Sequence, residues 1–221
     1  MILNVKYKSP QWYELRKNHI GASESGAIMG LSKFMSNIDL WEQKVGLKEP
    51  KDLTDNELVN YGIKAEEYLA KLFELDFPQY EFVDTKDIVL VNDKLPFMMA
   101  SPDGLLVDKR TNKKGIFENK TANDKDGKTR KEWGIDHIPN NYYCQLLHTF
   151  ACDDSLEFAV IKCQIKYITD NGENCFCETL HRKILREEVE EDIEILEKEE
   201  IAFWEKVEKN ERPPLKLPLW T

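Results

Sequence analysis

The sequence predicts an α/β fold in which helices flank a β-sheet, and three observations predict it. Apolar residues recur at helical spacing in the first third of the chain. Short runs rich in β-branched and aromatic residues follow between Tyr80 and Ala122, with turn residues between them. A helix, two strand candidates and a long acidic helix complete the chain. No repeat or low-complexity linker divides it, so a single domain over residues 1–221 is expected.

Four helices are expected in the N-terminal third, and the first two have clear start signals. Ser9 as N-cap and Pro10 in the first turn predict a short helix that reaches about Asn18. Ser23 is the expected N-cap of a second short helix, which stops near Gly30.

The next two helices are predicted by apolar spacing and by capping residues. Residues 37–45 carry three apolar side chains on one face, and Gly46 follows as a stop signal. Thr54 and Glu57 form a capping box that predicts a long amphipathic helix to about Phe77.

The remaining elements follow from changes in the pattern. Five strand candidates, YEFVD, DIVLV, FMMAS, GLLVD and GIFENKTA, predict a small, mostly antiparallel sheet. Residues 123–138 are polar and rich in Lys and Arg, and they are expected to form a mobile loop. Pro139 then opens a helix to about Cys152. Two further strands, SLEFAVIKCQIKYI and ENCFCETLHR, are expected before an acidic helix at about 183–211.

Composition limits the classes of function. The formal net charge of -10 argues against indiscriminate nucleic-acid binding, because DNA affinity comes from Lys and Arg placed against phosphates. Much of the acid lies in residues 186–211, so local DNA contacts remain open. Neither a secretion signal nor a run of about 18 apolar residues occurs, and five cysteines do not form a disulfide framework. A cytoplasmic protein without membrane partners is expected.

The strongest chemical signal is the motif SPDGLL followed by FENK. Strand alternation places Glu118 and Lys120 on one face, and a neighbouring strand can bring Asp103 beside Glu118. Two carboxylates with backbone oxygen and water form the oxygen-rich site that Mg2+ or Mn2+ prefers. Such a site suits phosphodiester hydrolysis, with Lys120 orienting the attacking water or stabilising developing charge. An ordinary alternative stays open, because isolated E-x-K pairs are usually solvated ion pairs and D-G is usually a turn.

Further motifs resemble one protein family. Asp103, followed by Glu118 and Lys120 on the next strand, resembles the PD-(D/E)XK nuclease superfamily. The segments WYELR (12–16), GASE (21–24), GIKAE (62–66) and YYCQ (142–145) resemble its lambda exonuclease and YqaJ-type viral recombinase branch, in the family's order. The resemblance implies a restriction-endonuclease-like fold, with a central mixed β-sheet flanked by helices.

The resemblance also implies a role for each matching residue. Asp103 and Glu118 would bind two Mg2+ ions with the backbone carbonyl of Asn119, Glu66 would act through water, and Lys120 and Gln145 would flank the nucleophile. From the residues alone, Glu66 is one of several carboxylates on an amphipathic helix.

A second site, for a DNA end, is implied at the N-terminus. The residues expected to contact DNA or its 5'-terminal phosphate are Trp12, Arg16, Ser23, Lys33, Ser101 and Tyr142. Arg16 can fork to phosphate oxygens, and Ser23 offers a hydroxyl at a helix start. Simpler roles stay open: Ser23 as an N-cap, Arg16 as a surface residue, Tyr142 in packing, and Trp12 as either a core anchor or a wedge against the terminal base pair.

The implied activity is that of a Mg2+-dependent 5'-to-3' exonuclease on double-stranded DNA. The same resemblance implies a homotrimeric ring, a single-strand annealing protein as partner, and a phage or prophage gene acting in a bacterial cytoplasm. Two alternatives remain: another nuclease of the superfamily that acts on single strands or as an endonuclease, and a non-catalytic protein that binds DNA ends.

Overall fold

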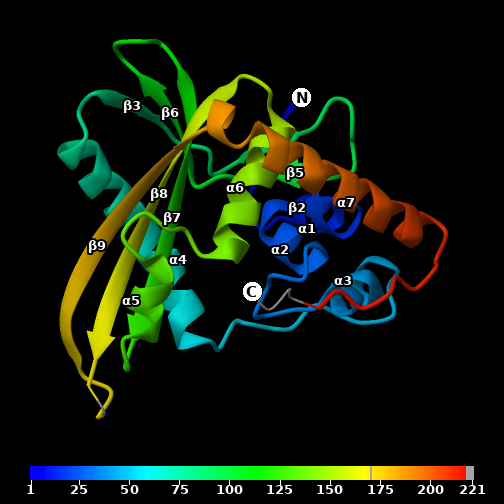
Figure 1. The fold of residues 1–221 in the computed structure, drawn as a ribbon, viewed down its shortest axis with the longest axis horizontal. Helices are drawn as coiled ribbons and strands as arrows, with labels where there is room; N and C mark the ends of the chain where they lie inside the picture. Colours follow the sequence, from blue (N-terminus) through cyan, green and yellow to red (C-terminus); the bar gives the residue numbers. More distant parts are fainter. Residues whose placement is uncertain (170, 218–221) are drawn as a thin grey trace.

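The computed structural model describes residues 1–169 and 171–217, and two β-sheets organise it (Figure 1). The larger sheet is mixed and has the strand order β3-β6-β7-β8-β9, in which only the β7–β8 pair is parallel. Its strands are β3 (Tyr80–Val83), β6 (Gly104–Asp108), β7 (Lys114–Asp124), β8 (Leu156–Ile168) and β9 (Asn174–Leu185). The expected central mixed sheet is therefore confirmed.

A second, smaller sheet was not expected. It has the order β1-β4-β5-β2. Strands β4 and β5, which were predicted to share a sheet with β6 and β7, belong to this smaller sheet instead. Its strands are β1 (Ile2–Asn4), β2 (Ile20–Gly21), β4 (Ile88–Val91) and β5 (Met98–Ala100). The first two are too short for a period-two pattern, and their partners lie far along the chain, so local sequence signals could not find them.

Three N-terminal helices form close to their expected bounds: α1 (Pro10–Lys17), α3 (Asn37–Lys44) and α4 (Glu57–Asp76). Ser9 caps α1 as expected, because its side chain accepts a hydrogen bond from Trp12 N. Thr54 was the wrong cap for α4. The side chain of Asn56 instead accepts bonds from the first free backbone N–H groups, whereas Thr54 bonds to Asp52.

The second helix is shorter than predicted and starts later. A 3-10 turn over Ala22–Glu24 leads into α2 (Ser25–Ile28), so Ser23 lies inside the turn and is not an N-cap. The Glu24 carboxylate takes the place of a capping group by accepting a hydrogen bond from Gly21 N at 2.8 Å.

Two predictions for the C-terminal half were wrong in part. The expected loop at 123–138 contains α5 (Lys128–Trp133), whose Trp133 is buried and fixes the segment on the protein core. The acidic helix α7 (Glu190–Glu208) begins later than predicted, because β9 extends to Leu185. The helix opened by Pro139 is confirmed as α6 (Asn140–Cys152).

The larger sheet is covered on both faces. Phe117 and Val160 face α4, where they pack with Phe73, whereas Ile116 and Ile161 belong to the core that includes α6. This explains why the first half of β7 is buried almost without alternation. Helix α6 lies between this sheet and α7 (Figure 1). None of the helices that the structure describes has the length and apolar composition of a membrane span.

A buried ion pair joins α6 to α7. His148 Nδ1 lies 2.9 Å from both carboxylate oxygens of Glu200, and His148 Nε2 lies 2.9 Å from Met99 O of β5. Both ring nitrogens face acceptors, so the imidazole is charged and donates twice. Burial lowers the pKa of His148, but Glu200 outweighs burial and the net pKa is well above its ordinary value.

We expect Glu200→Ala to lower the free energy of unfolding by about 3–5 kcal/mol, because it leaves the His148 cation buried without its partner. The exposed Glu208→Ala, on the same helix, serves as control and should change stability by less than about 0.5 kcal/mol. Urea unfolding at neutral pH measures both. Equal stability of the two variants would contradict the ion-pair assignment.

Candidate active site

Pairing of β6 with β7 brings the two motif carboxylates together. Gly104 lies opposite Phe117, so Asp103, immediately before β6, reaches the next positions on β7. The backbone N–H of Asn119 donates to Asp103 Oδ2 at 2.7 Å. The prediction that a neighbouring strand would place Asp103 beside Glu118 therefore agrees with the geometry.

Glu118 is held from two sides. Its Oε1 accepts hydrogen bonds from Lys120 Nζ and from Gln145 Nε2 of α6, each at 2.5 Å. The side chain is buried, and its second oxygen, Oε2, has no hydrogen-bond partner in the described part of the chain. A buried carboxylate oxygen without a donor is costly, so this atom is suited to a ligand.

Glu66 joins this cluster from α4. Asn119 Nδ2 donates to the Glu66 backbone carbonyl at 3.4 Å, which connects the helix to β7. Partial burial raises the pKa of the Glu66 carboxyl, and the nearby Glu118 raises it further. The carboxylate that the motif singled out on α4 therefore lies within electrostatic reach of Glu118.

The cluster is electrostatically crowded. Burial, followed by the charge of Glu118, raises the pKa of Asp103 well above its ordinary value despite the opposing Lys120. Burial lowers the pKa of Lys120, but Glu118 and Asp103 outweigh it and the net pKa is raised. Lys120 thus stays charged at neutral pH, and one ammonium group partly offsets three carboxyls.

The donor set fits a hard divalent cation. Two carboxylates, one of them with an unpartnered oxygen, supply the ligands that Mg2+ prefers, and the resemblance adds the Asn119 carbonyl and water. No group of three or more His, Cys, Asp or Glu side chains within residues 1–169 and 171–217 forms a ready metal cage. The fit therefore depends on main-chain oxygen and water, as Mg2+ sites often do.

A second polar cluster surrounds Arg16. Its Nη2 lies 3.2 Å from Glu24 Oε1 and 3.5 Å from Ser23 Oγ. Lys44 Nζ lies 2.7 Å from the other oxygen of Glu24 and also donates to the backbone carbonyl of Arg16. Burial raises the pKa of Glu24, but Lys44 and Arg16 outweigh it and the net pKa is lowered. One carboxylate between two cations leaves a net positive charge, which favours an anion beside Ser23.

Trp12 lies under this cluster. The Arg16 guanidinium carbon is 5.2 Å from the Trp12 ring centroid, so the ring supports the cation. Trp12 is only 8% exposed and packs with Val89 and Met99 of the smaller sheet. Of its two alternative roles, burial favours the core anchor over the wedge.

The other expected DNA contacts lie in different environments. Lys33 is exposed and forms an ion pair with Glu132 of α5. Ser101 Oγ is buried and has no hydrogen-bond partner among the described residues. Tyr142 lies beside Lys120, whose Nζ is 5.2 Å from the centroid of the Tyr142 ring.

Sequence reasoning missed three residues of these clusters. Glu24 stands inside a recognised motif but received no role, although its position beside Ser23 was a usable signal. Lys44 and Tyr7 lay outside every motif. The fold places Lys44 Nζ 2.7 Å from Glu24 and the Tyr7 ring 5.1 Å, centroid to centroid, from Trp12.

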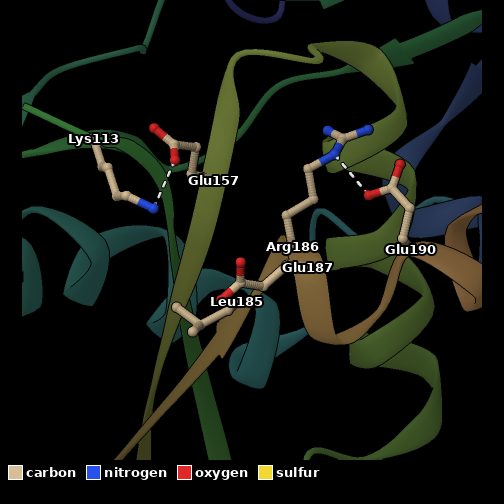
Figure 2. A pocket seen from close by; sticks show the side chains of 6 residues that line it. All are labelled: Lys113, Glu157, Leu185, Arg186, Glu187 and Glu190. Carbon is tan, nitrogen blue, oxygen red and sulfur yellow. Dashed lines mark hydrogen bonds and ion pairs between the residues drawn. The ribbon is translucent and has the colours of Figure 1, made fainter.

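A shallow surface pocket elsewhere is a poor active-site candidate (Figure 2). It lies where β7 and β8 begin, and its lining residues are Lys113, Glu157, Leu185, Arg186, Glu187 and Glu190. Lys113 pairs with Glu157 at 2.8 Å and Arg186 with Glu190 at 3.0 Å, so most of its charges are satisfied internally.

Comparison with known proteins agrees with this geometry. Residues 11–155 match the model of the YqaJ-like viral recombinase domain. Over 145 residues the chain is 29% identical to the uncharacterized protein YqaJ of Bacillus subtilis (strain 168), a region that covers 66% of this chain and 42% of that protein. The chain thus spans less than half the length of this curated relative.

The fold has solved counterparts. The chain is similar to the crystal structure of an alkaline exonuclease (LHK-Exo) from Laribacter hongkongensis, with a TM-score of 0.59 and 17% identity over 91% of this chain and 94% of the other. LHK-Exo in complex with dAMP gives a TM-score of 0.59 and 18% identity with the same coverage. The expected PD-(D/E)XK fold is confirmed.

We expect Asp103→Asn to stabilise the metal-free protein by about 1 kcal/mol at pH 8. The folded-state pKa of Asp103 is raised, so the free energy of unfolding falls as pH rises from the unfolded-state pKa to the folded-state pKa. The variant avoids this loss and keeps an oxygen to accept from Asn119 N. Urea unfolding with a chelator, at about pH 8 and about pH 4, measures the difference, which should vanish at the lower pH.

The matched control is Asp136→Asn, at an exposed position, which should change stability by less than about 0.5 kcal/mol at either pH. A destabilised Asp103→Asn protein at the higher pH would show that the carboxylate is a structural group.

Proposed function

Because the chain belongs to the YqaJ-like viral recombinase domain family, we propose that it is a metal-dependent deoxyribonuclease. More specifically, it acts as a 5'-to-3' exonuclease on double-stranded DNA and leaves 3' single-stranded overhangs. One observation carries the proposal: the buried Glu118 carboxylate is fixed by Lys120 and Gln145 beside Asp103, and one of its oxygens is left open. The fold that the chain shares with an alkaline exonuclease supports the same activity.

The residues of the cluster divide the work of phosphodiester hydrolysis. Asp103 and Glu118, with the Asn119 carbonyl and with Glu66 through water, would hold Mg2+ or Mn2+, two ions in the full site. When bound, such ions lower the pKa of water and offset charge on the phosphate. Lys120 stays protonated and lies where it can orient the nucleophile or donate to the phosphate. Gln145 keeps Glu118 in place.

The Arg16 cluster supports the proposed polarity. A terminal 5' phosphate beside Ser23 would meet the guanidinium fork and the excess positive charge left by Lys44. The strand then enters the carboxylate cluster from its 5' end. A chain that cuts internally has no need of such a pocket.

The proposal extends to the biological setting. A homotrimeric ring would let basic groups face the DNA while the acidic α7 faces outward, which reconciles a net charge of -10 with DNA binding. The overhang would pass to a single-strand annealing protein. The expected setting is the cytoplasm of a bacterial host that carries the gene on a phage or prophage.

An end-labelled degradation assay tests activity and polarity together. The substrates are 5'-phosphorylated, 5'-hydroxyl and covalently closed circular duplexes, incubated with the protein and Mg2+. Loss of nucleotides from 5'-phosphorylated ends, with circles intact, is the expected result. Rapid cutting of closed circles would replace the exonuclease proposal with an endonuclease, and binding without degradation would favour a protein that only binds DNA ends.

Lys120→Ala should lower kcat on the 5'-phosphorylated duplex by about 100- to 1000-fold, because it removes a preorganised donor from the reaction centre. Lys114→Ala is the control, since Lys114 is exposed at the far end of the same strand. It should retain parental activity. Full activity in the Lys120→Ala protein would refute the assigned chemistry.

Arg16→Ala should reduce the preference for 5'-phosphorylated over 5'-hydroxyl ends by about 10- to 100-fold, the magnitude of a lost hydrogen bond to a charged group. Its exposed neighbour Lys17 provides a control of the same charge, because Lys17→Ala should keep the preference. The ratio of kcat/KM values for the two ends is the readout. An unchanged ratio would place the phosphate pocket elsewhere.

A further inference from the structure

The segment just before α1 holds a strained tight turn. Ser9 N donates to Lys6 O at 3.0 Å, and between them Lys8 has a φ of 57°, in the left-handed region that residues other than glycine rarely adopt. Asp87 fixes the segment twice, since its carboxylate accepts from Tyr7 N and its carbonyl accepts from Val5 N, each at 2.9 Å. Strain that is held so firmly often marks a functional position.

This turn determines where the Tyr7 ring lies. The ring packs edge-on against Trp12, with centroids 5.1 Å apart and an interplanar angle of 75°. Trp12 is the residue that also supports the Arg16 guanidinium. Tyr7 nevertheless keeps 37% of its surface exposed, and the Lys8 ammonium lies 5.3 Å from its ring centroid. The ring is therefore braced by Trp12, and a flexible side chain that can move aside lies over it.

Electrostatics show what else Tyr7 faces. Burial raises the pKa of the Tyr7 hydroxyl, Glu66 and Asp103 raise it further, and Arg16 acts in the opposite direction. Contacts agree with this placement: Tyr7 N is bonded to Asp87, close in the chain to Thr85, whose Oγ1 donates to Pro102 O next to Asp103. On its other side the Tyr7 ring contacts Trp12, which lies under Arg16.

We propose that the exposed Tyr7 ring packs against the 5'-terminal nucleoside, between the phosphate held at Arg16 and the phosphate at Asp103 and Glu118. This inference rests on the proposed function and adds a specificity residue to it. The aromatic ring suits a base because stacking accepts all four bases, as an enzyme that degrades any sequence requires. The brace on Trp12 limits the freedom that the ring loses on binding.

The test compares Tyr7→Ala and Tyr7→Phe with the parent protein on two 5'-phosphorylated duplexes, one complete and one abasic at the 5'-terminal nucleotide. On the complete duplex, Tyr7→Ala should lose about 10- to 100-fold in kcat/KM, as expected for one lost stacking contact, and Tyr7→Phe should match the parent. On the abasic duplex the parent should fall to the level of Tyr7→Ala, and Tyr7→Ala should lose nothing further.

Tyr13→Ala is the matched control, because Tyr13 also contacts Trp12 edge-on, at 5.2 Å, and is more exposed. It should behave as the parent on both duplexes. The stacking role is refuted if Tyr7→Phe loses as much kcat/KM as Tyr7→Ala. It is also refuted if the parent exceeds Tyr7→Ala by the same factor on the abasic duplex as on the complete one.

Binding of the same duplexes in a chelating buffer, followed by fluorescence anisotropy, separates this inference from the nuclease proposal. A parent protein that binds ends but degrades none would refute the nuclease, whereas the loss of end affinity in Tyr7→Ala would still support the Tyr7 contact. Equal affinity of the parent and Tyr7→Ala for the complete duplex, with equal activity, would refute the contact itself.

Discussion

The hydrogen bond from Asn119 N to Asp103 Oδ2 is the constraint on which the rest of the site depends. It joins the turn before β6 to the middle of β7, and so fixes two negative groups within one buried region. Water cannot screen them there, so Lys120 and Gln145 must approach Glu118 closely. The polar side chains of β7, α4 and α6 are thus arranged around the negative charge that strand pairing brings together.

Much of the carboxylate cluster could be predicted from the sequence. Glu118 and Lys120 lie two residues apart on a strand, and the period of a strand alone puts them on one face. Asp103 could be placed nearby because its SPDG motif lies in the turn between two predicted strands. Glu66 was found only through its motif, since nothing in the helical pattern distinguishes it from Glu67.

The parts that sequence reasoning missed depend on distant pairing. Lys44 meets Glu24 because α3 packs near the 3-10 turn. Tyr7 lies beside Trp12 and the Arg16 cluster because β1 pairs with β4 across more than eighty residues. Short strands carry no periodic signal, so the smaller sheet could not be predicted. The loop expected at 123–138 was wrong in part for a related reason: Trp133 lies in a segment of mostly polar and charged residues, and its burial depends on contacts with distant parts of the chain.

The separation of the strands into two sheets has a geometric consequence. The Arg16 cluster lies against the smaller sheet, and Asp103 and Glu118 belong to the larger one. Helix α6 packs against both sheets through fully buried side chains such as Leu146. Close-packed interiors resist compression. The Arg16 cluster and the carboxylate cluster are therefore held on one rigid frame. In the proposed exonuclease, the distance from the bound strand end to the point of cleavage would stay the same for all four bases.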